Sequence, residues 1–181
     1  CGFAYRTSIF KQSANRWMIT AVVLALPQDW KPTVSYKALQ TVLGDNTTPT
    51  ATQVSEAVMK IRQDKLPDWE EVGTAGSFFA NPRVDNETLK TLQESYPDIP
   101  VFHNYDSLEH TIPAGWLVEH CGLLSEEKEN YLYPKHHLVV VNNNKNTDRT
   151  SGAEIQAFTQ KVQEQVQDKF GIKLTPEVVI L

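Results

Sequence analysis

The sequence lacks the features that mark several large classes of protein. Its longest apolar run, from Ala21 to Pro27, is far shorter than the roughly 20 residues that a membrane-spanning helix needs. Only 2 cysteines occur in 181 residues, too few for a disulfide framework, so a reducing compartment and by default the cytoplasm are expected. The 17 basic residues, against 22 acidic ones, are scattered singly. We therefore expect neither a membrane nor a nucleic acid as a partner.

Sequence signatures of metal and nucleotide sites are missing as well. His120 and Cys121 are neighbours, as are His136 and His137, but no C-x-x-C or H-x-x-x-H spacing occurs. Adjacent side chains rarely point at one ion, so no metal site is expected. The 8 glycines form no G-x-G-x-x-G or Walker sequence, so no local motif announces a nucleotide cofactor.

What is present is a loose alternation of helix and strand patterns, which favours an α+β fold. Capping residues, helical spacing and proline or glycine stops predict helices over residues 50–65, 85–94, 113–121 and 151–171. Apolar and β-branched runs predict strands over residues 16–26, 137–142 and 174–181. A helix that stops at the KLPD sequence indicates a domain boundary near Lys65 to Asp68.

Ser77 stands between a glycine and two phenylalanines in the stretch VGTAGSFFANP. In one interpretation Gly73 and Gly76 make a permissive turn and the serine bonds nearby backbone, which is the commoner case. In the other, the flexible backbone lets a ligand approach and the hydroxyl faces it. The stretch alone favours the turn.

Four further residues also allow two interpretations each. Arg62 and Lys65 lie near a predicted helix C-terminus, where they can be solvated capping cations or can bind an anionic ligand together. Glu177 lies in an apolar strand pattern and can face solvent or a cleft, where a buried carboxylate needs a partner. Tyr5 fits a core or interface position better than a site.

The order of the motifs is more informative than any one of them. The segments FAYRTSIFK, RQDKLPD, GTAGSFFANP, PAGWLVEHCGL, HHLVVVN and GIKLTPEVVIL, in this order, resemble the C-terminal half of the UDP-N-acetylenolpyruvoylglucosamine reductase (MurB) family over nearly the whole chain. The resemblance implies the end of an FAD-binding domain over residues 1–66 and a substrate-binding domain over 67–171. Residues 172–181 would be a final strand returning to the N-terminal lobe.

The resemblance also implies a function. Members of this family are cytoplasmic enzymes of peptidoglycan precursor synthesis, and thus serve cell-wall biogenesis, cell shape and cell division. They use NADPH and FAD to reduce UDP-N-acetylglucosamine enolpyruvate to UDP-N-acetylmuramate. Ser77 matches the serine that supplies a proton to the substrate, and Glu177 the carboxylate that acts beside it. Positions that match substrate-binding residues of the family are Tyr5, Arg62, Lys65, Asn81 and His136.

The chain starts at Cys1 without an initiator methionine, and the family's flavin domain precedes the matched part. We therefore expect a piece of a longer protein, inactive without its N-terminal half and holding FAD weakly or not at all. Two departures from the family pattern are a missing glycine pair near residues 124–134 and Val179 in place of an arginine. They leave open an alternative, a non-catalytic module that binds a UDP-sugar or another protein.

Overall fold

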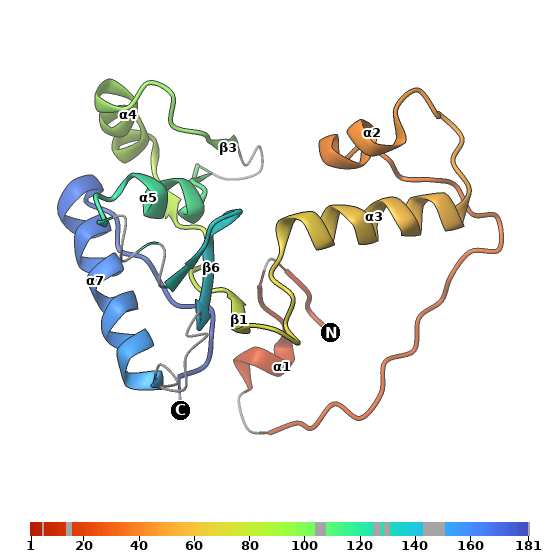
Figure 1. The fold of residues 1–181 in the computed structure, drawn as a ribbon, viewed down its shortest axis with the longest axis horizontal. Helices are drawn as coiled ribbons and strands as arrows, with labels where there is room; N and C mark the ends of the chain where they lie inside the picture. Colours follow the sequence, from red (N-terminus) through yellow and green to blue (C-terminus); the bar gives the residue numbers. More distant parts are fainter. Residues whose placement is uncertain are drawn as a thin grey trace. The chain divides into compact units, whose positions relative to one another are not determined.

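The chain divides into two compact units, Cys1–Thr33 and Val34–Leu181. Figure 1 traces both units in the computed structural model. The structure describes all residues except 5, 14–15, 104–107, 125–127, 129–130, 143–150 and 181, and it leaves out the side chain of His103.

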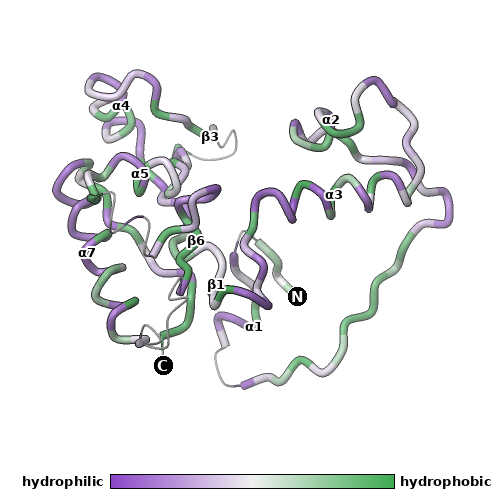
Figure 2. Tube along the Cα trace, in the orientation of Figure 1, coloured by the Kyte–Doolittle hydropathy of each residue, from purple (hydrophilic) through white to green (hydrophobic). Residues whose placement is uncertain are grey.

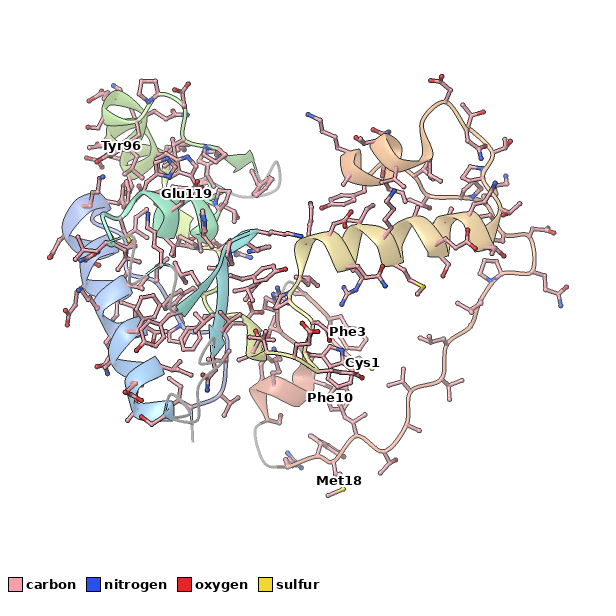
Figure 3. All side chains as sticks on the ribbon, in the orientation of Figure 1. Cys1, Phe3, Phe10, Met18, Tyr96 and Glu119 are labelled. Atoms are coloured by element: carbon pink, nitrogen blue, oxygen red, sulfur yellow. The ribbon has the colours of Figure 1, made fainter. Side chains whose placement is uncertain are left out.

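The described residues of the first unit form a short helix and a long extended segment. Helix α1 spans Ile9–Gln12, and the Ser8 side chain caps it by accepting a hydrogen bond from the Lys11 N–H. The strand predicted over residues 16–26 is wrong, because no described strand pairs with this segment. Most of the segment is apolar (Figure 2), and its side chains are exposed. The side chain of Met18, which Figure 3 labels, is 88% exposed. Its β-branched composition suits a strand, but a strand also needs a neighbouring edge for its hydrogen bonds.

The second unit carries the helices that the capping residues predict. Thr50 and Gln53 form a capping box at the start of one helix, and Ser151 and Glu154 form one at the start of another. Gly171 ends the latter in the left-handed conformation that glycine adopts without strain. The predicted helices are α3 (Ala51–Lys65), α4 (Asn86–Ser95), α5 (Ala114–His120) and α7 (Gly152–Phe170). The unit also contains α2 (Lys37–Leu43), which has no side-chain cap and lies in a stretch whose sequence favours a loop. None of the described helices combines the length and apolar character needed to cross a bilayer.

Within the described residues, two small antiparallel sheets accompany these helices, in agreement with the α+β fold expected from the sequence. One has the strand order β1-β6-β5 and the other β2-β4-β3. The strands are β1 (Gly73–Ser77), β2 (Arg83–Val84), β3 (Phe102–His103), β4 (His110–Thr111), β5 (Leu132–Tyr133) and β6 (His136–Asn142). In the described part of the strand predicted over 174–181, residues 174–180, the β-structure is an isolated bridge with Phe79 opposite Pro176.

The core of the second unit lies where α5 packs against both β6 and α7 (Figure 1). Leu117 of α5, Val162 and Val166 of α7, and Leu174 after that helix have no exposed surface. On α7, the buried Phe158, Val162 and Val166 recur at helical spacing, so this helix buries one face along its length. The core therefore fixes β6, the strand against which β1 and Ser77 are held.

The N-cap of α4 gives the fold a testable acid dependence. The Asp85 carboxylate accepts the Thr88 N–H at 2.8 Å, and this hydrogen bond lowers the pKa of Asp85 below its ordinary 3.8. A carboxylate whose pKa is lower in the folded than in the unfolded state stabilises the fold at pH values above its unfolded pKa. This stabilisation is lost as the pH falls through its pKa in the folded state. Asp85→Ala is expected to lower the thermal midpoint at pH 7, and the difference from wild type should shrink below about pH 3.8.

Circular dichroism melts at pH 7, 5 and 3 test this dependence. Asp85→Asn keeps an oxygen acceptor but cannot titrate, so it serves as the matched control. An Asp85→Ala deficit that is equally large at pH 3 and pH 7 would contradict the assignment.

Candidate active site

Ser77 ends β1 at an irregularity in its pairing with β6. Thr74 lies opposite Val141 and Ser77 opposite Val139, so three residue steps on β1 face two on β6. The extra residue makes a β-bulge, and Gly76 within it has φ +77°, a conformation that favours glycine. The interpretation of this stretch as a turn is therefore corrected: it is a bulged strand.

The bulge leaves Ser77 facing away from the core. Its partner Val139 is buried but lies outside the core cluster, to which Leu138 and Val140 belong. The next residue, Phe78, donates its N–H to the Leu138 carbonyl at 2.9 Å and packs in that cluster. Ser77 is half-buried, and its hydroxyl has no hydrogen-bond partner within the part of the chain that the structure describes. The hydroxyl is thus available to a ligand.

Glu177 lies opposite Phe78, the residue after Ser77, although Ser77 and Glu177 are far apart in the sequence. The Glu177 N–H donates to the Phe78 carbonyl at 2.7 Å, and the Ala80 N–H donates to the Thr175 carbonyl at 3.0 Å. The two catalytic candidates therefore occupy neighbouring positions across one antiparallel pairing. Glu177 is half-buried there.

Asn81 has a structural contact that the sequence did not indicate. Its Oδ1 accepts the Ala114 N–H at 2.9 Å, at the first residue of α5. The N-cap residue of this helix, Pro113, offers no side-chain cap, so Asn81 supplies one from outside the helix. The amide nitrogen stays available as a donor, and substrate binding by Asn81 stays a prediction.

Three predicted substrate-binding residues, Arg62, Lys65 and His136, line one pocket of about 420 Å³. Tyr36 joins them: its hydroxyl oxygen is 3.4 Å from Lys65 Nζ, which also lies 5.7 Å from the centre of the tyrosine ring. The other lining residues are Leu39, Val58, Ile61 and Leu66. The Arg62 guanidinium forms no ion pair among the described residues.

Tyr36 is a candidate that sequence reasoning missed. It stands in a loop before α2, and only the packing of α2 against α3 brings it to Lys65. No periodicity or motif in the sequence reports that packing. Tyr5, the remaining predicted substrate residue, lies outside the described residues.

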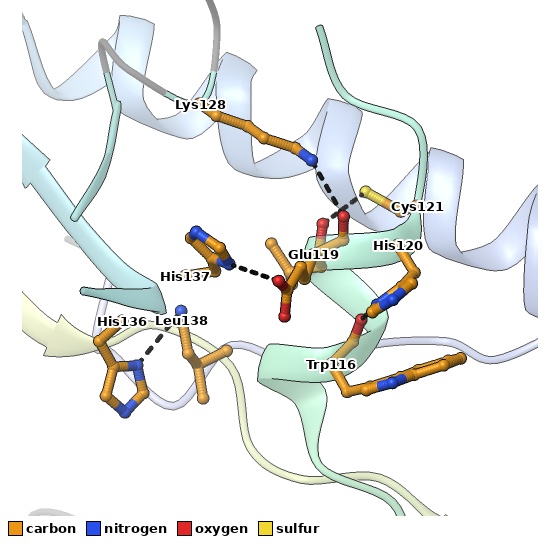
Figure 4. Close-up of polar contacts among 9 residues, drawn as sticks. Trp116, Glu119, His120, Cys121, Lys128, His136, His137 and Leu138 are labelled. Carbon is orange, nitrogen blue, oxygen red and sulfur yellow. Dashed lines mark hydrogen bonds and ion pairs between the residues drawn. The ribbon is translucent and has the colours of Figure 1, made fainter. Parts of the chain in front are cut away.

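The neighbouring histidines of β6 face different surroundings (Figure 4). His136 Nδ1 accepts the Leu138 N–H at 3.4 Å and its ring lines the pocket, whereas His137 Nδ1 lies 3.7 Å from Glu119 Oε1 on α5. Alternation along a strand separates adjacent side chains in this way.

Close to His120, burial raises the pKa of the Cys121 thiol. Among the described residues no cluster of three or more metal-binding side chains occurs.

Comparison with known proteins assigns the chain to a family. Residues 67–181 match the family model described as UDP-N-acetylenolpyruvoylglucosamine reductase, C-terminal domain. Proteins named UDP-N-acetylenolpyruvoylglucosamine reductase are similar to the whole chain. That of Cupriavidus pinatubonensis is 38% identical over 100% of this chain and 53% of its own length, and that of Idiomarina loihiensis is 39% identical over 98% and 51%. The chain spans about half the length of the curated relatives it matches, and it belongs to the UDP-N-acetylenolpyruvoylglucosamine reductase family.

Proposed function

We propose that this chain is the C-terminal half of a reductase that converts UDP-N-acetylglucosamine enolpyruvate to UDP-N-acetylmuramate in the cytoplasm, with NADPH and FAD. The observation that supports the proposal is the hydrogen bond from the Glu177 N–H to the carbonyl of Phe78, which brings the backbone of Glu177 opposite the residue after Ser77. The name of the curated relatives supports the same reaction. Residues 1–66 would then complete a flavin domain, and the family match begins at Pro67.

The described residues fit one side of a flavin site. An added Cβ at Gly76 would meet no atom within 4 Å, so a planar ring has room to approach the backbone beside Ser77. When bound, FAD would supply the hydride that it takes from NADPH. The sequence has no glycine-rich phosphate motif, so we assign the rest of the flavin site to the N-terminal half of the protein.

Ser77 would hold the proton that the reduced substrate takes up. A serine hydroxyl is a very weak acid, so it donates only to a strongly basic carbon in a site poor in water. Phe78 and Phe79, which follow it, are 4% and 2% exposed and close the core side of the site to water. Glu177 would bind next to it, at the substrate carboxyl.

The pocket at the end of α3 would hold the diphosphate. Cations in the last turn of a helix can simply be solvated, as the sequence alone allows. Here, however, Arg62 and Lys65 line the same pocket as His136, and the guanidinium has no carboxylate partner in the described structure. Charge-assisted hydrogen bonds to a diphosphate would use both cations.

Arg62→Gln tests this part of the proposal. It is expected to raise the Kd for UDP-N-acetylglucosamine by about 10- to 100-fold, since a hydrogen bond to a charged group contributes about 1.5–3 kcal/mol. Isothermal titration calorimetry on the natural-length protein measures the effect. Lys60→Gln, an exposed cation on the same helix, is the matched control. If Arg62→Gln and wild type bind UDP-N-acetylglucosamine with equal affinity, Arg62 is a solvated cation at the C-terminus of α3 and does not bind the diphosphate.

The alternative function, a non-catalytic UDP-sugar or protein-binding module, has one observation in its favour. Val179 stands where the family resemblance puts an arginine, and its side chain is 84% exposed. A module that binds the UDP-sugar would depend on Arg62, and neither it nor a protein-binding module would oxidise NADPH. Turnover by the natural-length protein therefore separates the two functions.

A further inference from the structure

The hydroxyl of Thr74 fills the bulge that precedes Ser77. Its Oγ1 donates to the Val140 carbonyl at 2.9 Å and accepts the Gly76 N–H at 3.0 Å. A bulge interrupts the regular ladder and deprives backbone groups of their partners on the facing strand. Here one side chain bonds a carbonyl on β6 and an N–H on β1, and a hydroxyl is the smallest group that can do both.

The bulge also determines which face of the sheet Ser77 occupies. In a regular strand, residues three apart, such as Thr74 and Ser77, lie on opposite faces. Here they pair with Val141 and Val139, which are two apart, and directly paired residues share a face. Without the extra residue, Ser77 would therefore turn toward the core face. Its hydroxyl would then point among apolar side chains instead of toward a ligand.

We propose that Thr74 is a positioning residue for Ser77: its hydroxyl holds the bulge at Gly76 and so keeps the serine hydroxyl on the face opposite the core. The inference rests on the proposed function, in which Ser77 supplies the proton. It assigns Thr74 no contact with substrate. A displacement of about 1 Å at a reacting group can cost about 100-fold in rate, so the bulge need not collapse for the effect to be large.

The test compares Thr74→Val, which keeps the shape but removes both hydrogen bonds, with Thr74→Ser, which keeps them. In the natural-length enzyme, Thr74→Val is expected to lower kcat by about 10- to 100-fold with KM within about twofold of wild type. Thr74→Ser, which keeps the hydroxyl, should have the kcat of wild type. Thr91→Val is the matched control, because Thr91 Oγ1 donates to the Glu87 carbonyl on the exposed face of α4.

A second measurement is independent of activity. Amide hydrogen exchange at Gly76, followed by NMR, should be faster in Thr74→Val than in wild type, and Thr74→Ser should restore protection. If Thr74→Val does not fold, Thr74→Ala takes its place in both measurements.

The possible outcomes separate this inference from the function on which it rests. Wild-type kcat in Thr74→Val, in an enzyme that Ser77→Ala inactivates, overturns the positioning role and leaves the proposed function intact. The positioning role alone is also overturned if amide exchange at Gly76 is the same in Thr74→Val and wild type, or if Thr74→Ser loses as much kcat as Thr74→Val. A wild-type protein with no reductase activity overturns both.

Discussion

Alanine in place of Ser77 is expected to cut turnover by roughly 100- to 10,000-fold, the range that a positioned proton donor contributes. Reduction of flavin by NADPH should keep its wild-type rate, because that step does not use the serine hydroxyl. Steady-state NADPH oxidation with the enolpyruvyl ether measures turnover in the natural-length enzyme. Anaerobic stopped-flow loss of flavin absorbance measures the first half-reaction separately.

Ser95→Ala provides the matched control for this variant. Ser95 ends α4 on the exposed surface, away from β1, so its removal should leave both half-reactions unchanged. Normal turnover in Ser77→Ala would exclude the serine as proton donor. Equal loss of both half-reactions would instead point to a disturbed fold.

Leu174→Ala is expected to lower the free energy of unfolding by about 2–5 kcal/mol, the range observed when a buried leucine is truncated. The side chain has no exposed surface, and its carbonyl accepts a hydrogen bond from Gln163 Nε2 of α7 at 2.8 Å. It directly precedes the segment 175–177, which pairs with residues 78–80. Truncation should therefore also loosen the backbone that carries Glu177.

Urea denaturation followed by circular dichroism measures the loss. Leu108→Ala removes the same atoms from a side chain that is 81% exposed, and it should change stability by less than about 0.5 kcal/mol. Similar small effects for both variants would show that Leu174 does not anchor the C-terminal segment.

The helices are predictable because their boundaries depend on local chemistry. Thr50 with Gln53, and Ser151 with Glu154, satisfy backbone groups within four residues of chain, so the sequence contains both partners. Proline at position 67 and glycine at position 171 likewise act on their immediate neighbours.

The strands and the pocket depend on partners distant in the sequence, and here prediction is weaker. The segment 16–26 has strand composition but no described strand beside it. The reverse holds for β1, whose glycine-rich sequence favours a turn and which is a strand only because β6 pairs with it. Ser77 and Glu177 are identified through family resemblance, whereas Tyr36 and Thr74 become visible only through the contacts they make.

The cap that Asn81 gives to α5 constrains how that amide can discriminate among ligands. Its oxygen accepts the Ala114 N–H, which fixes the orientation of the amide and uses one of the two lone pairs of the oxygen. Groups rich in oxygen acceptors would find the N–H donors of the amide there, whereas ammonium or guanidinium groups would have to share the oxygen with the N-terminus of α5. The hydrogen bond that caps the start of α5 thus also orients the Asn81 amide so that its N–H donors are the groups most available to a ligand.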